Sequence, residues 1–420
     1  MNIPRQKSFW AISFGHTVND IFMSMGPVLL AFLSAQVLPI TNTQIGAAVS
    51  AQQLTGALSQ PLFGFLADRG GPRWQRVLGI GGVLWVIGLL MLSLALAMTG
   101  NFGLMVVPYA LAALGSGAFH PVGTMHAAEV DRQHATGNLS YFFLLGQTGL
   151  ALGPALAGIL LDAANPAGSP AVSVTPLYML GLVALPVLGF MAIAMPGRIA
   201  AHQAEATHHT DAQTEPRPAS RTTLPIGGLA LLAVVVLMRS LAQPGSVAFI
   251  PRLFQMKGWD PAEYGLITSS FWIASGLAGV LMGQLADRYD RRHVIMVSLL
   301  ASAPALFLLP VTTSKPAAFL LAIAAGGLTG GSHSVIVALA QSLIPGKKGF
   351  ASGLTLGFLF ATGAVGSLLI GSAADQIGLN SAFQLVSGAV VIAGLLALRL
   401  PQGAEQPRST AATATAPTSR

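Results

Sequence analysis

About twelve long apolar stretches decide what this chain can fold into. In the first half they cover residues 9–36, 44–67, 77–98, 102–126, 136–161 and 176–195, and in the second half 225–250, 264–285, 293–311, 316–341, 350–374 and 381–400. A helix needs about 20 apolar residues to cross the hydrocarbon of a bilayer. Charged residues make up only 8% of the chain, about a third of the share in soluble domains, so they are too few to cover a surface in water. We therefore predict an all-α integral membrane protein with twelve transmembrane helices.

Two polar segments divide the chain. Residues 197–224 include the run AHQAEATHHTDAQTEPRPASR, which has no apolar periodicity and is typical of a flexible linker. Residues 401–420 are rich in Ala, Thr, Ser and Pro and are predicted to form a disordered tail. Residues 1–196 and 225–400 then form two units with six spans each.

Short segments recur between these units at nearly constant spacing. Residues 64–69 (GFLADR) recur as 283–288 (GQLADR), 219 positions later, and His120 is matched by His333, 213 positions later. Two further matches pair Thr148-Gly149 with Thr362-Gly363 and Asp162 with Asp375. The order of these matches predicts two pseudo-symmetric six-helix bundles, an arrangement in which transporters place a site between related halves.

Basic residues lie mostly on one side of the predicted spans. Seventeen of the 21 Lys and Arg residues fall on the side of the termini and the linker, three fall on the other side, and Arg239 lies inside a span. Cytoplasmic loops carry such an excess, so we expect both termini in the cytoplasm of a bacterial cell and the spans in its inner membrane. The net charge of +7 then reflects topology, and nucleic acid is not an expected partner.

Two charged residues lie deep inside spans of opposite halves. Asp20 is in the first span and Arg239 in the seventh, and their spacing of 219 is the spacing of the repeat. Each costs about 2.5–3.5 kcal/mol at a helix centre, so such residues are rarely kept without a partner or a function. We hypothesise that the two approach each other in one state. Proton binding to Asp20 would free Arg239 for an anionic substrate, and substrate binding would favour release of the proton. The alternatives are a permanent structural ion pair, or local hydrogen bonds from Asn19 or His16 to Asp20.

Other polar residues share the same spans. His16 lies four residues before Asp20, and histidine can titrate near neutral pH or contact an anion. A lone histidine in a membrane can equally serve as an interhelix hydrogen bond. We assign proton coupling to Asp20 and His16, and substrate binding to Asn19, His120, Arg239, Gln243 and His333.

Several motifs resemble those of a known family. The segment GFLADRGGPR at 64–73, with its second copy from residue 283, resembles the loop motif of major-facilitator transporters, and GLALGPALAG at 149–158 resembles the helix-five motif of drug/proton antiporters. HTVND at 16–20, GAFHP at 117–121, Arg239-Ser240 and QSLIP at 341–345 resemble the fosmidomycin-resistance branch. That branch has an acidic residue where this chain has Val122, so no role can be carried over at that position.

The resemblance implies a major-facilitator fold in which helices one, four, seven and ten line a central cavity. It also implies gating residues at the cytoplasmic face that form a breakable latch, whereas the arginines among them could serve topology alone. These gating residues are Asp68, Arg69, Arg73, Asp287 and Arg288.

These observations lead to a predicted function. We expect a monomeric, proton-coupled exporter of a small drug-like or anionic compound, powered by the proton gradient without a cofactor or a bound metal. A proton-coupled uptake symporter for a small organic anion is the alternative. An integral-membrane enzyme would need a nucleophile with a base or clustered metal ligands near one membrane face; we identify none and do not expect an enzyme.

Overall fold

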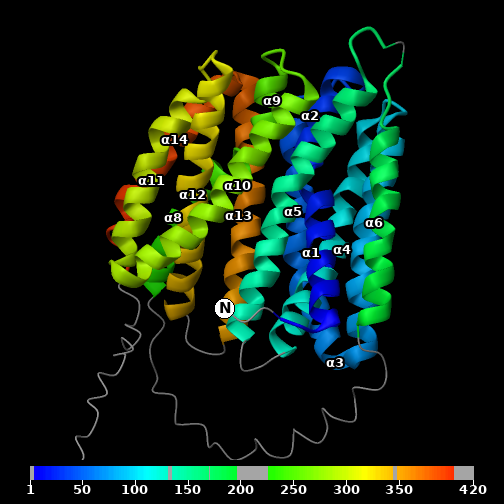
Figure 1. Cartoon of the computed structure of the whole chain (residues 1–420). Helices are drawn as coiled ribbons and strands as arrows, with labels where there is room; N and C mark the ends of the chain where they lie inside the picture. Colours follow the sequence, from blue (N-terminus) through cyan, green and yellow to red (C-terminus); the bar gives the residue numbers. More distant parts are fainter. Residues whose placement is uncertain (1–3, 131–134, 170, 196–225, 344–347, 402–420) are drawn as a thin grey trace, which may run out of the picture.

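The computed structural model describes residues 4–130, 135–169, 171–195, 226–343 and 348–401, and these ranges contain helices and no strand. The predicted linker and tail lie outside the described residues, apart from Pro401. The helices stand side by side in two groups (Figure 1). The first group is α1 (Lys7–Ser24), α2 (Gly26–Gln36), α3 (Asn42–Ala97), α4 (Phe102–Glu129), α5 (Ala135–Ala164) and α6 (Thr175–Ala194). The second group is α8 (Ile226–Ser240), the π-helical turn η3 (Leu241–Gly245), α9 (Ile250–Gln255), α10 (Pro261–Arg288), α11 (Arg291–Leu308), α12 (Lys315–Leu343), α13 (Lys348–Ile377) and α14 (Leu379–Ala397).

Helix α3 accounts for two of the predicted spans. It has 56 residues and would be about 84 Å long if straight, against about 30 Å of hydrocarbon. The chain breaks inside it at Gly71, where φ is 64° and ψ is −169°, a conformation open to glycine because it has no Cβ. The described residues contain eleven helices long and apolar enough to cross a membrane. With α3 divided, the twelve predicted spans are confirmed.

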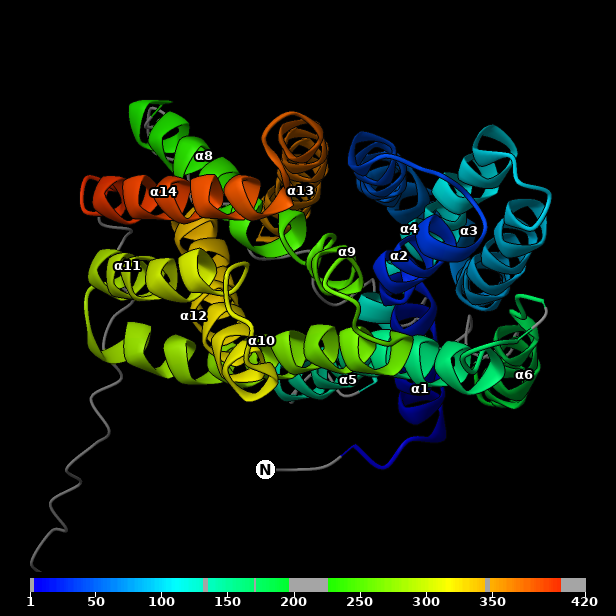
Figure 2. The same cartoon turned by 90° about the horizontal axis from the view of Figure 1, so that it is seen from above.

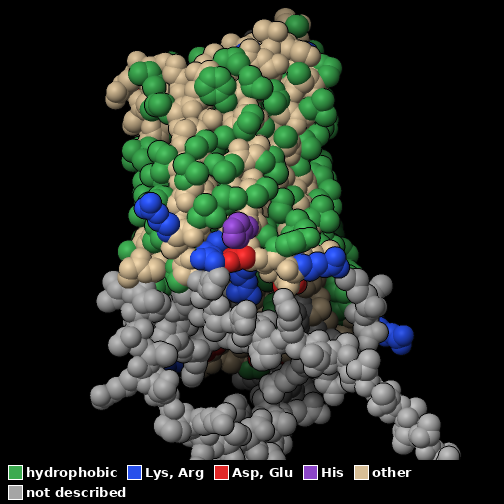
Figure 3. Space-filling model, turned by 90° about the vertical axis from the view of Figure 1, so that its left-hand side faces the viewer, with side chains coloured by type: hydrophobic (Ala, Val, Ile, Leu, Met, Phe, Trp, Pro, Cys, Tyr) green, Lys and Arg blue, Asp and Glu red, His purple; other side chains and the backbone are tan. Residues whose placement is uncertain are grey.

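The exterior of the described residues is apolar. Leu58, Val183 and Ile193 are 77%, 71% and 87% exposed, an arrangement suited to lipid tails rather than water. On the face in Figure 3, apolar side chains cover most of the surface, and Lys and Arg gather at one end. This distribution fits a protein surrounded by a bilayer.

Spans one and seven are interrupted midway. The first passes from α1 to α2 at Met25, and Pro27 lies in the first turn of α2. The seventh leaves α-helical geometry directly after Arg239 and Ser240, where η3 contains Pro244. Proline removes a backbone donor, and π-helical turns occur frequently at functional sites.

The two groups meet mainly through α3 with α13 and α5 with α10. A Cβ added at Gly46 would lie 2.5 Å from the carbonyl oxygen of Ser367, and one at Gly158 would lie 2.3 Å from that of Pro261. Gly46 is near the start of α3 and Gly158 near the end of α5. These helix ends lie toward the end of the molecule that carries α2 and α9, opposite the end where the chain enters α1 (Figure 1). Seen from above, α9 lies beside α2, and α13 lies beside the start of α3 (Figure 2). We call this end the joined end.

Candidate functional site

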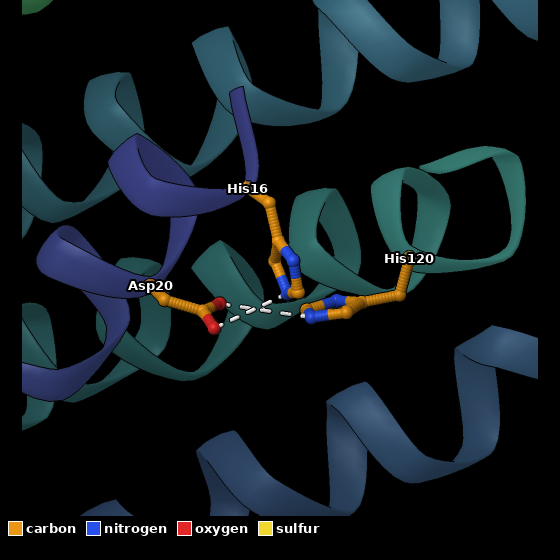
Figure 4. Close-up of side chains that lie close together, drawn as sticks. All are labelled: His16, Asp20 and His120. Atoms are coloured by element: carbon orange, nitrogen blue, oxygen red, sulfur yellow. Dashed lines mark ion pairs between the residues drawn. The ribbon is translucent and has the colours of Figure 1, made fainter. Parts of the chain in front are cut away.

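One carboxylate and two imidazoles meet inside the first group of helices (Figure 4). Asp20 on α1 is 7% exposed. Its Oδ2 lies 3.3 Å from Nε2 of His16, one helical turn earlier, and its Oδ1 lies 3.6 Å from Nε2 of His120 on α4. We call these three residues the His–Asp–His cluster.

Backbone carbonyls fix both rings of the cluster. Nδ1 of His16 lies 2.9 Å from the carbonyl oxygen of Phe142 on α5, and the His16 ring stacks on the Phe142 ring with centroids 4.1 Å apart. Nδ1 of His120 lies 2.8 Å from the carbonyl oxygen of Ser116. Gly146 leaves room for His16, because a Cβ there would lie 2.3 Å from Cε1 of the ring.

Asn19 connects the carboxylate to α4. Its Nδ2 donates to Oδ1 of Asp20 at 2.8 Å and to Oγ of Ser116 at 3.1 Å. The local contacts that we gave as an alternative, from Asn19 and from His16 to Asp20, are therefore both present. In this conformation Asn19, which we assigned to substrate, is 0% exposed and holds the carboxylate.

Arg239 follows Asp20 at the spacing of the repeat, lies in the last turn of α8 in the second group and is 1% exposed. Its Nη2 donates to Oε1 of Gln243 and, at 3.0 Å, to the carbonyl oxygen of Thr329 on α12. Its Nε lies 3.3 Å from the same carbonyl and 3.4 Å from Oγ of Ser332. Gln243, in η3, in turn donates to Oγ of Ser275 at 2.8 Å. All these acceptors are neutral, and no carboxylate of the described residues lies within ion-pair distance.

Asp20 and Arg239 are thus buried in protein, each in its own half, and do not pair with each other in this conformation. His333 follows Ser332 on α12, near the guanidinium, and is partly exposed. The structure gathers Asp20, His16, Asn19 and His120 in one half and Arg239 and Gln243 in the other.

The predicted gating residues are exposed. Within the described part of the chain, Asp68 and Asp287 form no ion pair, and the guanidinium of Arg69 lies 4.0 Å from the centroid of the Phe65 ring. The predicted latch is not formed among these residues, and its role stays a prediction. Arg73 and Arg288 are likewise exposed.

A carboxylate that we had not assigned connects the halves at the joined end. Asp375, near the end of α13, accepts from the backbone N–H of Asn42 at 3.0 Å, from Nδ2 of Asn42 at 3.0 Å and from the backbone N–H of Thr43 at 2.8 Å. It thereby caps the N-terminus of α3, where negative charge is favourable. Sequence reasoning noted Asp375 only as the repeat partner of Asp162.

A second contact crosses the halves beside it. Arg252 on α9 donates from Nη1 to Oγ of Ser34 on α2 at 2.6 Å. Burial lowers the pKa of the Arg252 guanidinium, whereas the nearby Asp375 carboxylate opposes that shift. These residues add polar contacts to the close packing of α3 against α13.

Val122 replaces the acid expected from the family motif. It is 0% exposed, and a Cβ added at Gly79 would lie 3.4 Å from its Cγ1. The valine fills the packing between α4 and α3.

Comparison with known proteins identifies the family. The model of the Major Facilitator Superfamily matches residues 12–256 and, a second time, 229–419. The chain belongs to this superfamily. This major-facilitator chain is 28% identical over 400 residues to the fosmidomycin resistance protein of Escherichia coli (strain K12), with 93% of this chain and 92% of that protein covered. It is 26% identical over 397 residues to an uncharacterized MFS-type transporter of Bacillus subtilis (strain 168), with 93% and 91% covered.

Solved structures show the same fold. A crystal structure of a D-xylose–proton symporter matches with a TM-score of 0.73 at 15% identity, covering 94% of this chain and 98% of the symporter. The predicted family and its two-bundle, twelve-helix fold are confirmed.

The cluster can also be considered as a cation site. One ligand atom from each of its three residues lies within 4.8 Å of the others, a separation that one small cation could bridge. The same atoms suit protons, which imidazole exchanges near neutral pH.

Proposed function

We propose that this chain is a proton-coupled exporter of a small anionic compound, with the His–Asp–His cluster as the proton site and Arg239 as the anion site. The observation that carries the proposal is a buried guanidinium in one half that has no counter-ion in the described part of the chain. It lies at the repeat position of a buried, histidine-bound carboxylate in the other half. His333 and Gln243 lie near that guanidinium and would contact the substrate.

Arg239 supports the choice of an anion. A buried charge is costly unless it is paired, and the neutral oxygens around Arg239 satisfy its hydrogen bonds without neutralising it. A guanidinium matches carboxylate or phosphonate oxygens in a planar, two-pronged geometry. An anionic substrate would therefore supply the missing charge.

Two similarities support export. The segment 149–158 is similar to the helix-five motif of antiporters, and the chain is related to a fosmidomycin resistance protein. If the basic residues mark the cytoplasmic side, as positive-inside topology requires, the halves are closed at the periplasmic end. An exporter collects its substrate in such a state and an uptake symporter releases its substrate in it, so this closure alone does not set the direction.

One observation favours an uptake symporter instead. Protons on the cluster and an anion at Arg239 attract each other, and linkage makes this preference reciprocal. Charge alone thus predicts that substrate binding retains protons, the reverse of our expectation that it releases them. If the chain exports substrate in exchange for protons, the two must therefore bind to different conformations of the transporter, one open to the periplasm and the other open to the cytoplasm.

The direction of transport in vesicles tests both functions. The purified chain is reconstituted in vesicles with labelled fosmidomycin outside and a pH difference imposed across the membrane. Vesicles with a transporter that exchanges protons for substrate accumulate the label when the lumen is acidic. Vesicles with a proton symporter accumulate the label when the lumen is alkaline. Asp20→Asn should abolish the response to pH, whereas Lys257→Gln, on a loop away from the site, should keep it. Flux in the wild-type chain that ignores the pH difference would contradict proton coupling.

A further inference from the structure

We infer that the His–Asp–His cluster holds two exchangeable protons, one on Nε2 of each imidazole, with the carboxylate of Asp20 as their shared acceptor. The inference rests on the proposed function, because it describes the proton site of that transporter. His120, which we had first placed with the substrate, belongs to the proton site under the proposed function, and the inference gives it a proton of its own.

The first step concerns the tautomer of His16. A carbonyl oxygen can only accept a hydrogen bond, so Nδ1 of His16, 2.9 Å from the carbonyl oxygen of Phe142, carries the N–H. In a neutral ring the other nitrogen, Nε2, then has a lone pair. This lone pair faces Oδ2 of Asp20 at 3.3 Å.

His120 has the same arrangement. Its Nδ1 lies 2.8 Å from the carbonyl oxygen of Ser116, so this nitrogen also carries the N–H. The Ser116 hydroxyl, 3.1 Å from the same nitrogen, accepts from Asn19 and has a second lone pair that can accept from this N–H. Nε2 of His120 therefore presents a lone pair to Oδ1 of Asp20 at 3.6 Å.

Two lone pairs facing an ionised carboxylate repel it. Each contact becomes a charge-assisted hydrogen bond once a proton lies on its nitrogen. The two contacts use different carboxylate oxygens, so one proton does not satisfy both. The amide of Asn19 donates to Oδ1 and so favours the ionised carboxylate. The protons accordingly belong on the imidazoles, and the cluster changes from a charge of −1 to +1 when both bind.

Among the described residues, no other charge competes for these protons. Helices α2, α3, α4, α5 and α6 pack against α1, and of their described residues only His120 brings a charged or titratable group within ion-pair distance of Asp20 or His16. The side chain of His120 is 25% exposed, against 3% for that of His16. His120 is therefore the member that exchanges protons with the surroundings, and His16 is the inner position.

Nitrogen NMR of the full chain in lipid nanodiscs tests this assignment without a substrate. The chain has nine histidines, and ¹⁵N-labelled rings report separately on Nδ1 and Nε2. We expect two rings to pass from the Nδ1–H form to imidazolium as pH falls. His16→Gln and His120→Gln should each remove one of these signals, while His333→Gln should leave both. At a pH where the wild-type chain shows both imidazolium signals, Asp20→Asn should lose them.

Two results would overturn the inference. One is a proton that titrates on the Asp20 carboxyl, seen by ¹³C, while both rings stay neutral. The other is a single ring that passes from the Nδ1–H form to imidazolium in the wild-type chain, a reading that needs no variant and so does not depend on a variant folding. Failure of the proposed function is a different result, namely flux that ignores the pH difference while both imidazolium signals are present.

Discussion

Removing the carboxylate of Asp375 should loosen the joined end of the transporter. A carboxylate at an exposed helix N-terminus contributes about 0.3–1 kcal/mol through the helix dipole, and a net hydrogen bond about 0.5–1.5 kcal/mol. Asp375→Ala loses the charge and the hydrogen bonds to Asn42 and Thr43. Because Asp375 is exposed, water replaces part of these interactions, and we expect the contact between the halves to lose about 1–2 kcal/mol of stability. That energy corresponds to a factor of about 5–30 in an equilibrium.

The chain itself provides the assay, because it has no cysteine. Ser367 on α13 is 0% exposed, and its backbone packs against Gly46 of the other half. A single Ser367→Cys thiol should react with a maleimide only when the halves separate there, so its rate follows the open fraction. Adding Asp375→Ala should raise that rate about 5- to 30-fold.

Asp162 offers a matched control. It is the repeat partner of Asp375, and it faces the like charges of Asp260 and Glu263 at the start of α10. Neutralising it in Asp162→Asn relieves repulsion and should leave the thiol rate unchanged or lower. An Asp375→Ala rate equal to that of the parent, or equal acceleration by both variants, would refute the role of Asp375 as a latch.

Three further predictions concern the buried site. Arg239→Gln should abolish transport of labelled fosmidomycin in vesicles. Arg239→Lys should retain part of it, since lysine keeps the charge but lacks the planar, two-pronged donor geometry of the guanidinium. Equal activity of the parent chain and both variants would contradict an anion site. Gly146→Ala should displace the His16 ring and reduce pH-driven flux at least tenfold. Gly137→Ala on the same helix, with nothing within 4 Å of its added Cβ, should leave the flux unchanged. Both fluxes are normalised to inserted protein, and equal fluxes would show that transport does not depend on the position of the His16 ring. His120→Gln should lower the number of protons moved per substrate, read from the pH difference that halts net flux, from two to one; an unchanged ratio would place His120 outside the proton path.

The fold and part of the site followed from the sequence. Apolar runs long enough to cross a bilayer leave helices as the natural solution, and the repeat indicated that Asp20 and Arg239 hold matching places. The contact of His16 with Asp20 was also foreseeable, because residues four apart lie on one helix face.

Other features depend on tertiary contacts that no local pattern encodes. The neutral acceptors of Arg239 include a backbone carbonyl of Thr329, 90 residues away, and any residue type could supply it. The hydrogen bonds by which Asp375 caps the N-terminus of α3 join positions more than 330 residues apart. A Pro-Gly pair at 244–245 lies at the break in span seven, but an apolar stretch can carry such a pair and remain one helix, and we predicted one uninterrupted span there.

The two halves stabilise their buried charges in chemically different ways, and this difference limits how coupling can work. Asp20 has titratable neighbours, so on our proposal the charge of its cluster changes with proton binding, whereas the hydrogen-bond acceptors of Arg239 are neutral. Protons and an anion then favour each other's binding, and charge alone cannot make them exclusive. Protons and substrate can be kept apart in an exporter only by the equilibrium between the state open to the cytoplasm and the state open to the periplasm. We expect the contacts of Asp375 to bias this equilibrium. On this argument Asp375→Ala should increase proton leak without substrate while leaving the two imidazolium signals intact, and a leak equal to that of the parent chain would show that exclusion is set elsewhere.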